Sequence, residues 1–254
     1  MMGIMSKYTS QSRRIREIIF CLIKFIGGFF MKTIFKMTVL VPSIFLFSVS
    51  LMAQNSLNEQ LLAAAKRGDN AKATTLLVSG ANIEAESDSE EETPLMIAAF
   101  EGKIEMVKFL LSKGAKIDAV NFNGNTEVGI LAGTTYLLDE VAIEGLNMIK
   151  FLISEGAKIN TKDDSGATPL ILACWAGNDR IVRFLLASGA NISDKDNADM
   201  GPLHWAALRN HPSTVKILLD KGAKCCEKDK DGETPYDIAN KWGHYDVKSI
   251  LNKN

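Results

Sequence analysis

The sequence is poor in the residues that mark several classes of protein. Its 254 residues include only four cysteines, six prolines and three histidines, with 46% hydrophobic and 23% charged residues. This composition excludes a cysteine-stapled domain, a collagen-like chain and a wholly disordered chain. The formal net charge of −1 offers no basic excess for phosphate backbones, so we expect no nucleic-acid partner.

The sequence also lacks the motifs that are typical of an active site. It has no glycine-rich phosphate-binding loop, no nucleophile elbow and no paired metal-ligand motif. We therefore expect no enzyme activity, no cofactor and no metal site. A hydrolase sited in residues 129–145 is the alternative, but Asp139, Glu140 and Glu144 have the spacing of an ordinary surface helix.

Charge divides the chain into two unlike parts. Residues 1–53 hold seven of the 29 basic residues and one of the 30 acidic residues, so the rest of the chain has a net charge of −7. From Met31, two lysines precede an apolar run that ends at Ala53, which is the pattern of a secretory signal peptide. We predict a leader over 1–53 that starts at Met31 and is cleaved after Ala53. The protein would then be exported, to the periplasm or outside the cell.

An uncleaved leader is the alternative interpretation. A second apolar stretch precedes Met31, and Ile18 to Met52 together could act as a membrane anchor for a tethered spacer. Lipid would then have to accommodate several lysines and Pro42. The apolar run after Met31 is also shorter than the roughly 20 residues that span a bilayer. We therefore expect membrane contact only if the leader is retained.

The rest of the chain repeats with a period near 33 residues. A Gly-Ala pair recurs at spacings of 34, 42, 33 and 33 residues, beginning at Gly80, Gly114, Gly156, Gly189 and Gly222. A Thr-Pro-Leu marker or a variant of it runs in step, beginning at Thr93, Thr126, Thr168, Gly201 and Thr234. Such regularity indicates stacked units of the same supersecondary structure.

Each part of the unit has a physical explanation. The Thr hydroxyl can cap a helix whose first turn accepts Pro. A residue that tolerates a left-handed backbone ends this helix, namely Gly102, Gly177, Gly243 or, in one unit, Asn210. A second helix with an apolar stripe follows, as in VKFLL from Val107. About ten residues with an Asp-x-x-Gly turn then form a projecting hairpin loop.

The segment from Gly166 to Ile192, GATPLILACWAGNDRIVRFLLASGANI, resembles the ankyrin-repeat family in content, order and period. The likeness covers residues 57–254. It implies an all-α repeat solenoid of about six helix pairs including caps, with β-hairpin loops along one edge and the first helices lining a concave face. It also implies a protein–protein interaction scaffold that binds a partner protein, and we expect the chain to be monomeric.

One unit departs from this pattern. The unit from Thr126 lacks the Pro and carries nine extra residues within 129–145. Its apolar content, including Ile130, Leu131 and Tyr136, favours ordered packing. The insertion is either neutral and filled by its own side chains or a feature specific to a partner.

The family resemblance also implies where a partner would bind. Recognition would involve the loop tips and the two residues before each turn glycine, because the scaffold does not need these positions. The candidate partner-binding residues are Phe100, Glu101, Phe122, Asp164, Trp175, Met200, Leu208, Arg209, Lys230 and Trp242. Large aromatic residues and Arg are typical anchors of interfaces. Alternatively, Trp175 and Trp242 pack over the adjacent helix.

The histidines and cysteines have structural explanations. We expect His204 to bond the backbone of a neighbouring loop, and His211 and His244 to have structural roles. Cys174 and Cys225 occupy apolar positions and read as small hydrophobic residues, whereas Cys226 should be exposed. A redox or metal-binding role for Cys225 and Cys226 is the alternative, although a disulfide between adjacent residues is sterically awkward.

Overall fold

The computed structural model describes residues 34–134 and 139–253. The chain divides into two compact units, Met1–Leu57 and Asn58–Asn254. The predicted start at Met31 and the apolar residues before it lie outside the described residues, as do Tyr136 to Leu138 of the insertion. In the first unit the described residues are helical and belong to α2 (Ile34–Arg67), which includes the predicted cleavage position. Among the helices that the structure describes, none is both long and apolar enough to span a membrane.

In the described part of the second unit the helices form six pairs, which confirms the predicted all-α solenoid. The end of α2 pairs with α3 (Asn70–Val78), and the other pairs are α4 (Pro94–Phe100) with α5 (Ile104–Ser112), α6 (Glu127–Gly133) with α7 (Asp139–Ser154), α8 (Pro169–Ala176) with α9 (Asp179–Ala187), α10 (Pro202–Leu208) with α11 (Pro212–Asp220), and α12 (Pro235–Lys241) with α13 (Tyr245–Leu251).

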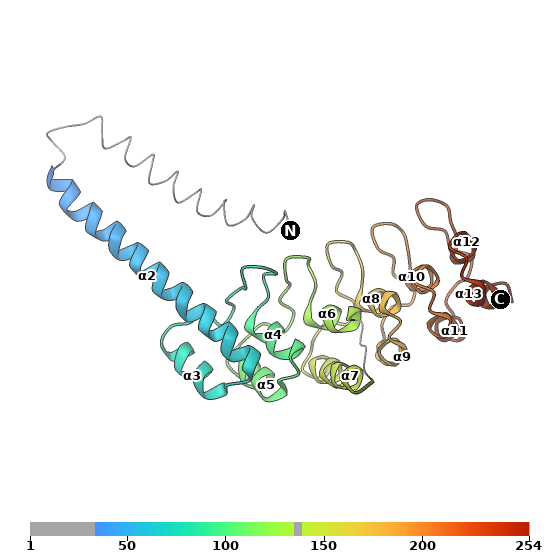
Figure 1. The fold of residues 1–254 in the computed structure, drawn as a ribbon, viewed down its shortest axis with the longest axis horizontal. Helices are drawn as coiled ribbons and strands as arrows, with labels where there is room; N and C mark the ends of the chain where they lie inside the picture. The colour runs from blue at the N-terminus through green and yellow to red at the C-terminus, as the bar shows by residue number, and fades with distance from the viewer. Residues whose placement is uncertain (1–33, 135–138, 254) are drawn as a thin grey trace. The chain divides into compact units, whose positions relative to one another are not determined.

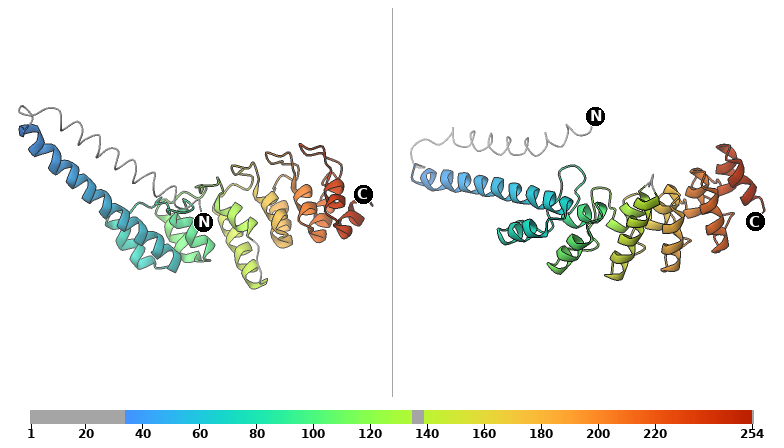
Figure 2. Two further views of the ribbon diagram at one scale, coloured as in Figure 1. Left: turned by 45° about the horizontal axis from the view of Figure 1, so that its top comes forward. Right: turned by 60° about the horizontal axis from the view of Figure 1, so that its bottom comes forward.

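The helices of the second unit form two rows. The inner row consists of α4, α6, α8, α10 and α12, each packed against the next. The odd-numbered partner helices form the outer row, in which α9, α11 and α13 likewise contact their neighbours. The connecting loops project beyond the inner row (Figure 1). The pairs follow one another in chain order in the further views as well (Figure 2).

The Thr-Pro marker starts the inner helices as predicted. The hydroxyls of Thr93, Thr168 and Thr234 accept hydrogen bonds from the backbone N–H groups of Met96, Ile171 and Asp237. Thr126 is the N-cap of α6 but makes no such bond with its side chain. Because an N-cap bond stabilises a helix by about 1 kcal/mol, α6 begins less favourably than its neighbours.

The predicted left-handed turn is confirmed after α4, α8, α10 and α12, whereas α6 ends at Thr134 with an extended backbone. Gly177 has φ +74°, and Asn210, which replaces Gly in its own unit, has φ +56°. Asn is the residue that adopts this backbone most readily after Gly, so the substitution keeps the turn.

The core lies between the two rows and repeats with the helices. Small residues such as Ala98, Ala173 and Ala206 are fully buried on the inner helices, so that neighbouring helices approach closely. Each outer helix contributes a leucine with 0% to 5% exposure, namely Leu76, Leu110, Leu152, Leu185, Leu218 and Leu251. Burying one such side chain contributes roughly 1.5–3 kcal/mol, so stability is spread along the stack.

The insertion lengthens the outer row. α7 has 16 residues, whereas α5, α9 and α11 have nine each. On the inner side, α6 meets α8 through two glycines, since a Cβ at Gly133 would lie 3.3 Å from the Cβ of Leu172 and one at Gly129 would lie 3.5 Å from its Cδ1. The extra residues therefore extend an outer helix while the inner helices stay close together.

Candidate interaction surface

Five successive loops are joined at their tips by four backbone hydrogen bonds. In each bond an N–H donates to a carbonyl of the preceding loop, over N–O distances of 2.8–3.0 Å: Phe122 to Glu90, Asp164 to Asn123, Asn197 to Ser165, and Lys230 to Ala198. No residue of these loops has strand structure in the part of the chain that is described. The loops are therefore hairpin-shaped turns that hold one another in register.

An aspartate or asparagine at the start of the turn fixes the shape of the last four of these loops. Oδ1 of Asp163 accepts the N–H groups of Ser165 and Ala167, both at 2.9 Å. Asn121, Asp196 and Asp229 make the equivalent bonds in their own loops. Such side-chain turns pre-organise the loop without the help of a strand. The tips are accordingly held at fixed positions.

The predicted tip residues differ in exposure. Phe122 is 49% exposed, and Asp164 and Lys230 are also exposed. Met200 is less exposed than these three residues, because it is half-buried, and its backbone N–H donates to Asp196 at 3.0 Å. The side chains of Phe122, Asp164 and Lys230 are thus the more available of the four.

The predicted residues before the turns lie at the ends of the inner helices. Trp242 is 61% exposed and Phe100 is 52% exposed, although both are large and apolar. Glu101 is half-buried, and its carboxylate lies 3.5 Å from Nζ of Lys66. Trp242 therefore does not pack over the adjacent helix as a core residue would.

Two of the predicted residues meet across adjacent repeats. The guanidinium carbon of Arg209, after α10, lies 4.7 Å from the ring centroid of Trp175, at the end of α8. Trp175 is half-buried beneath it and Arg209 is exposed. A cation–π contact of this kind is worth roughly 0.5–1 kcal/mol at an exposed site. We call Trp175, Arg209 and the half-buried Leu208, which precedes Arg209 in the sequence, the Trp175–Arg209 patch.

Histidines fix the backbone that carries this patch. Nε2 of His211 donates to the carbonyl of Trp175, and Nε2 of His244 donates to the carbonyl of Leu208, both at 3.1 Å. Each bond links one repeat to the one before it. The expectation of structural roles for His211 and His244 is therefore confirmed.

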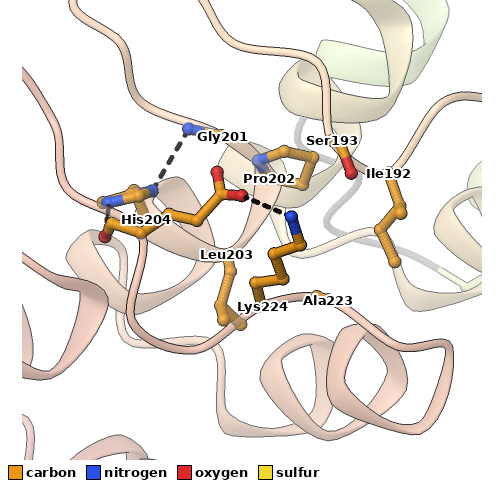
Figure 3. Close-up of a pocket in the computed structure, with 9 residues that line it drawn as sticks. Ile192, Ser193, Gly201, Pro202, Leu203, His204, Ala223 and Lys224 are labelled. Atoms are coloured by element: carbon orange, nitrogen blue, oxygen red, sulfur yellow. Dashed lines mark hydrogen bonds and ion pairs between the residues drawn. The ribbon is translucent and has the colours of Figure 1, made fainter.

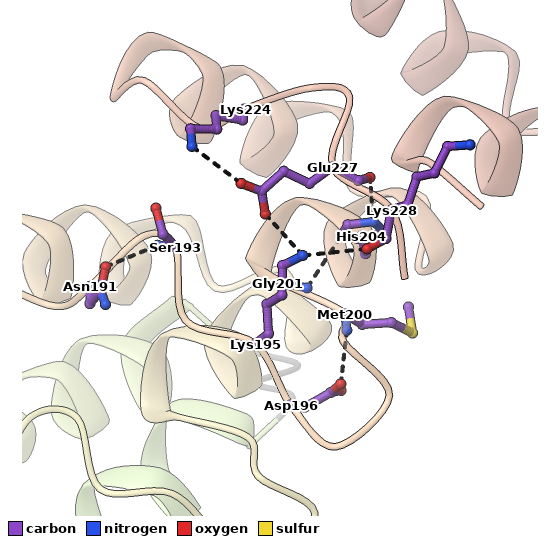
Figure 4. Close-up of polar contacts among 10 residues, drawn as sticks. All are labelled: Asn191, Ser193, Lys195, Asp196, Met200, Gly201, His204, Lys224, Glu227 and Lys228. Atoms are coloured by element: carbon purple, nitrogen blue, oxygen red, sulfur yellow. Dashed lines mark hydrogen bonds and ion pairs between the residues drawn. The ribbon is translucent and has the colours of Figure 1, made fainter. Parts of the chain in front are cut away.

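His204 links two loops as predicted. Its Nδ1 accepts the N–H of Gly201 at 3.2 Å, and its Nε2 donates to the carbonyl of Glu227 at 3.0 Å. Burial lowers the pKa of His204, because the charged ring would lose its hydration. Figure 4 shows Lys195 beside this link, where its Nζ contacts the Glu227 carboxylate at 3.2 Å and the Lys228 carbonyl at 3.3 Å. The hydrogen bond with Lys195 lowers the pKa of Glu227.

A small cavity adjoins the His204 link. It has a volume of about 20 Å³, and Ile192, Leu203 and Lys224 are among the residues that line it (Figure 3). A space of this size holds about one water molecule. Sites for small organic ligands are typically several hundred Å³, so this cavity is too small for an organic substrate.

The repeated geometry agrees with a comparison against protein families. A family model described as "Ankyrin repeats (3 copies)" matches residues 45–121, 120–196 and 193–254. The chain belongs to the ankyrin-repeat family. No curated protein matches the chain.

The ankyrin repeat that begins at Thr126 contains a buried acid. Glu127 stands where the other repeats have Pro, and only 1% of it is exposed. Neither carboxylate oxygen has a hydrogen-bond partner among the described residues. Burial raises the pKa of Glu127 well above its usual value, and the nearby Glu92 raises it further. The equivalent residues Pro94, Pro169, Pro202 and Pro235 are also buried, so Glu127 places a carboxyl at a position that the repeat buries.

Trp205 was absent from the sequence-based candidates for this ankyrin surface. It is half-buried on α10, and its indole N–H donates to Oδ2 of Asp196 at 2.7 Å. In the same position, other inner helices carry Ile97, Leu172 and Ile238. This change from an aliphatic residue to Trp was the feature of the sequence from which Trp205 could have been chosen as a candidate.

Cys174, Cys225 and Cys226, the cysteines of the ankyrin unit, form no disulfide in the described part of the chain. Cys174 is fully buried, Cys225 is half-buried and Cys226 is exposed, in agreement with the sequence-based expectation. No group of three or more His, Cys, Asp or Glu side chains in the described part of the chain could hold a metal ion.

Proposed function

We propose that this ankyrin-repeat protein binds another protein through its inner-helix ends and loop tips, and that it performs no chemistry. Ankyrin repeats generally mediate protein–protein interaction, which supports the class of function. The Trp175–Arg209 patch supports the location, because it combines an aromatic residue and an arginine outside the repeated core. Trp242 after α12 and Phe100 at the end of α4 add exposed apolar area at the ends of other inner helices.

The rigid framework favours binding without rearrangement. Loop-to-loop backbone bonds and the His211 and His244 bonds hold the surface residues at fixed positions. Pre-organisation of this kind lowers the entropy lost on association. The net charge of −7 on residues 54–254 favours a basic or mixed-charge partner, so we expect association to weaken as salt increases.

The test uses the full chain and variants of the patch. The partner is captured from the native envelope and identified, and its Kd is then measured by titration calorimetry. We expect W175A and R209A each to weaken binding by about 2 kcal/mol, which is roughly 30-fold. Y245A is the matched control, because Tyr245 is 81% exposed but lies on the outer row.

The double variant W175A/R209A sharpens the result. Since the two residues touch, their effects should be non-additive by at least about 0.5 kcal/mol. Wild-type affinity in both single variants would contradict the proposed surface, and so would an equal loss in Y245A. Substrate turnover by the rigorously purified chain would contradict the absence of chemistry.

We also propose that the protein is exported and that its leader is removed after Ala53. The basic start and apolar run of residues 31–53 support this. The mass of the mature N-terminus, together with cell fractionation, tests it. A chain that retains Met31 in the membrane fraction would favour the tethered alternative.

A further inference from the structure

The last projecting loop departs from a rule that the earlier loops follow. In those loops an isoleucine is followed by a polar residue: Ile83 and Glu84, Ile117 and Asp118, Ile159 and Asn160, and Ile192 and Ser193. In three of these the polar side chain accepts a backbone N–H of the next repeat, as Glu84 does from Lys116 at 2.9 Å. In these loops the polar residue therefore helps to join one repeat to the next.

Two cysteines replace this pair in the last loop. Cys225 occupies the isoleucine position and Cys226 the position of the polar acceptor. Their Sγ atoms contact each other at 3.2 Å, and Cys226 is exposed while Cys225 is half-buried. A thiol fills less apolar volume than isoleucine and accepts hydrogen bonds poorly, so the last loop departs from the pattern of the earlier loops at both positions.

Both ends of the segment that carries the thiols are anchored. Before it, the N–H of Ala223 donates to the carbonyl of Leu218 at 2.9 Å. After it, the Glu227 carbonyl accepts from His204, and the Glu227 carboxylate contacts Lys195. The two sulfurs are therefore presented together on a fixed turn.

The geometry of the two cysteines favours a third atom that bonds both sulfurs over a direct disulfide bond between them. An S–S bond requires about 2.04 Å between the sulfurs and about 4.4–6.8 Å between the Cα atoms. Neighbouring Cα atoms are about 3.8 Å apart across a trans peptide, so a disulfide at this place would be strained. A trivalent atom bonded to both sulfurs does not require them to come within S–S bonding distance.

A ligand bound at this place must complete its bonding with two sulfur atoms alone. The described residues provide no third His, Cys, Asp or Glu side chain that could complete a metal site. A trivalent arsenic atom that already carries one organic group needs only two thiols to complete its bonding.

We propose that Cys225 and Cys226 form a vicinal dithiol site that captures a monosubstituted trivalent arsenical, R–As=O. Two S–H bonds and the As=O bond break, two S–As bonds form, and the oxygen leaves with both thiol protons as water. Arsenic and sulfur keep their oxidation states, so no oxidant is needed.

The test measures binding of phenylarsine oxide to the reduced full chain. We expect one equivalent per chain, with an intact-mass increase of the reagent minus one water. The adduct should survive excess glutathione, a monothiol, and should be reversed by 2,3-dimercaptopropanol. Equilibrium dialysis with arsenic quantification gives the affinity.

Scaffold-like variants keep the test independent of folding. C225I and C226N restore residue types that the earlier loops use, and each should weaken binding by about 100-fold or more because one sulfur cannot chelate. The controls C174A and C21A should bind like wild type. The proposal is overturned if C225I or C226N keeps wild-type affinity, if a control loses it, or if glutathione displaces the adduct from wild type.

Discussion

The replacement of Pro by Glu127 gives a prediction about stability and pH. Its buried carboxyl lacks hydrogen-bond partners among the described residues, and an unsatisfied buried polar group costs about 1–3 kcal/mol. Burial raises the pKa of Glu127, so the folded protein holds this proton more tightly than the unfolded chain does. The resulting stability is complete below the unfolded value near 4.5 and is lost as pH rises through the folded pKa.

Two variants separate the causes. E127Q removes the titration, so its stability relative to wild type should increase with pH, by up to about 1.4 kcal/mol per pH unit within the titration window. E127P restores the residue that starts the other inner helices, such as Pro94 and Pro169, and also removes the buried carboxyl. We expect E127P to be stabilised by about 2 kcal/mol at pH 8, with a smaller gain at pH 5.

Urea unfolding followed by tryptophan fluorescence at pH 5, 6.5 and 8 measures these differences. E155Q is the matched control, because Glu155 is exposed, and it should stay within about 0.5 kcal/mol of wild type at each pH. A stability difference between E127Q and wild type that is the same at pH 5 and pH 8 would refute the reasoning. Glu127 would then hold its proton no more tightly in the folded chain than in the unfolded chain.

Two further predictions concern the links between loops. H204Q should remove a pH dependence of stability that has the opposite sign. Because burial lowers the pKa of His204, the stability that the neutral ring contributes is present above pH 6.5 and is lost as pH falls below that value. Urea unfolding midpoints of wild type and H204Q at pH 7.5 and 5 would show this. G124A should destabilise the chain by about 1–2 kcal/mol more than G232A, although both glycines have similar φ values of +73° and +78°. The reason is that a Cβ at Gly124 would lie 2.8 Å from the backbone N of Asp164, whereas one at Gly232 meets no atom within 4 Å. Equal losses of stability in thermal melts of the two variants would argue against the loop-to-loop bonds.

Features set by a few neighbouring residues could be predicted from the sequence. Thr168 caps its helix, Gly177 turns left-handed and Asn210 replaces such a glycine, and each outcome follows from local backbone sterics and hydrogen bonding. The loop bond of His204 was predicted from a motif position and is present. The period of 33 residues was sufficient to predict the stack, because identical units can only bury their apolar faces against one another.

The details of the candidate surface depend on contacts between repeats. Arg209 stacks on Trp175 because the ends of α8 and α10, in successive repeats, lie side by side, and Trp205 bonds Asp196 because the loop folds back over its own helix. The burial of Glu127 depends on how its neighbours cover it, and the 3.2 Å contact between Cys225 and Cys226 depends on the rotamers that the last loop allows. By itself the sequence determined the order and period of the helices and, outside the repeat that begins at Thr126, where the inner helices start and end, since these follow from short-range interactions. Only the tertiary structure decided which side chains meet, because that depends on the distance and orientation between packed repeats.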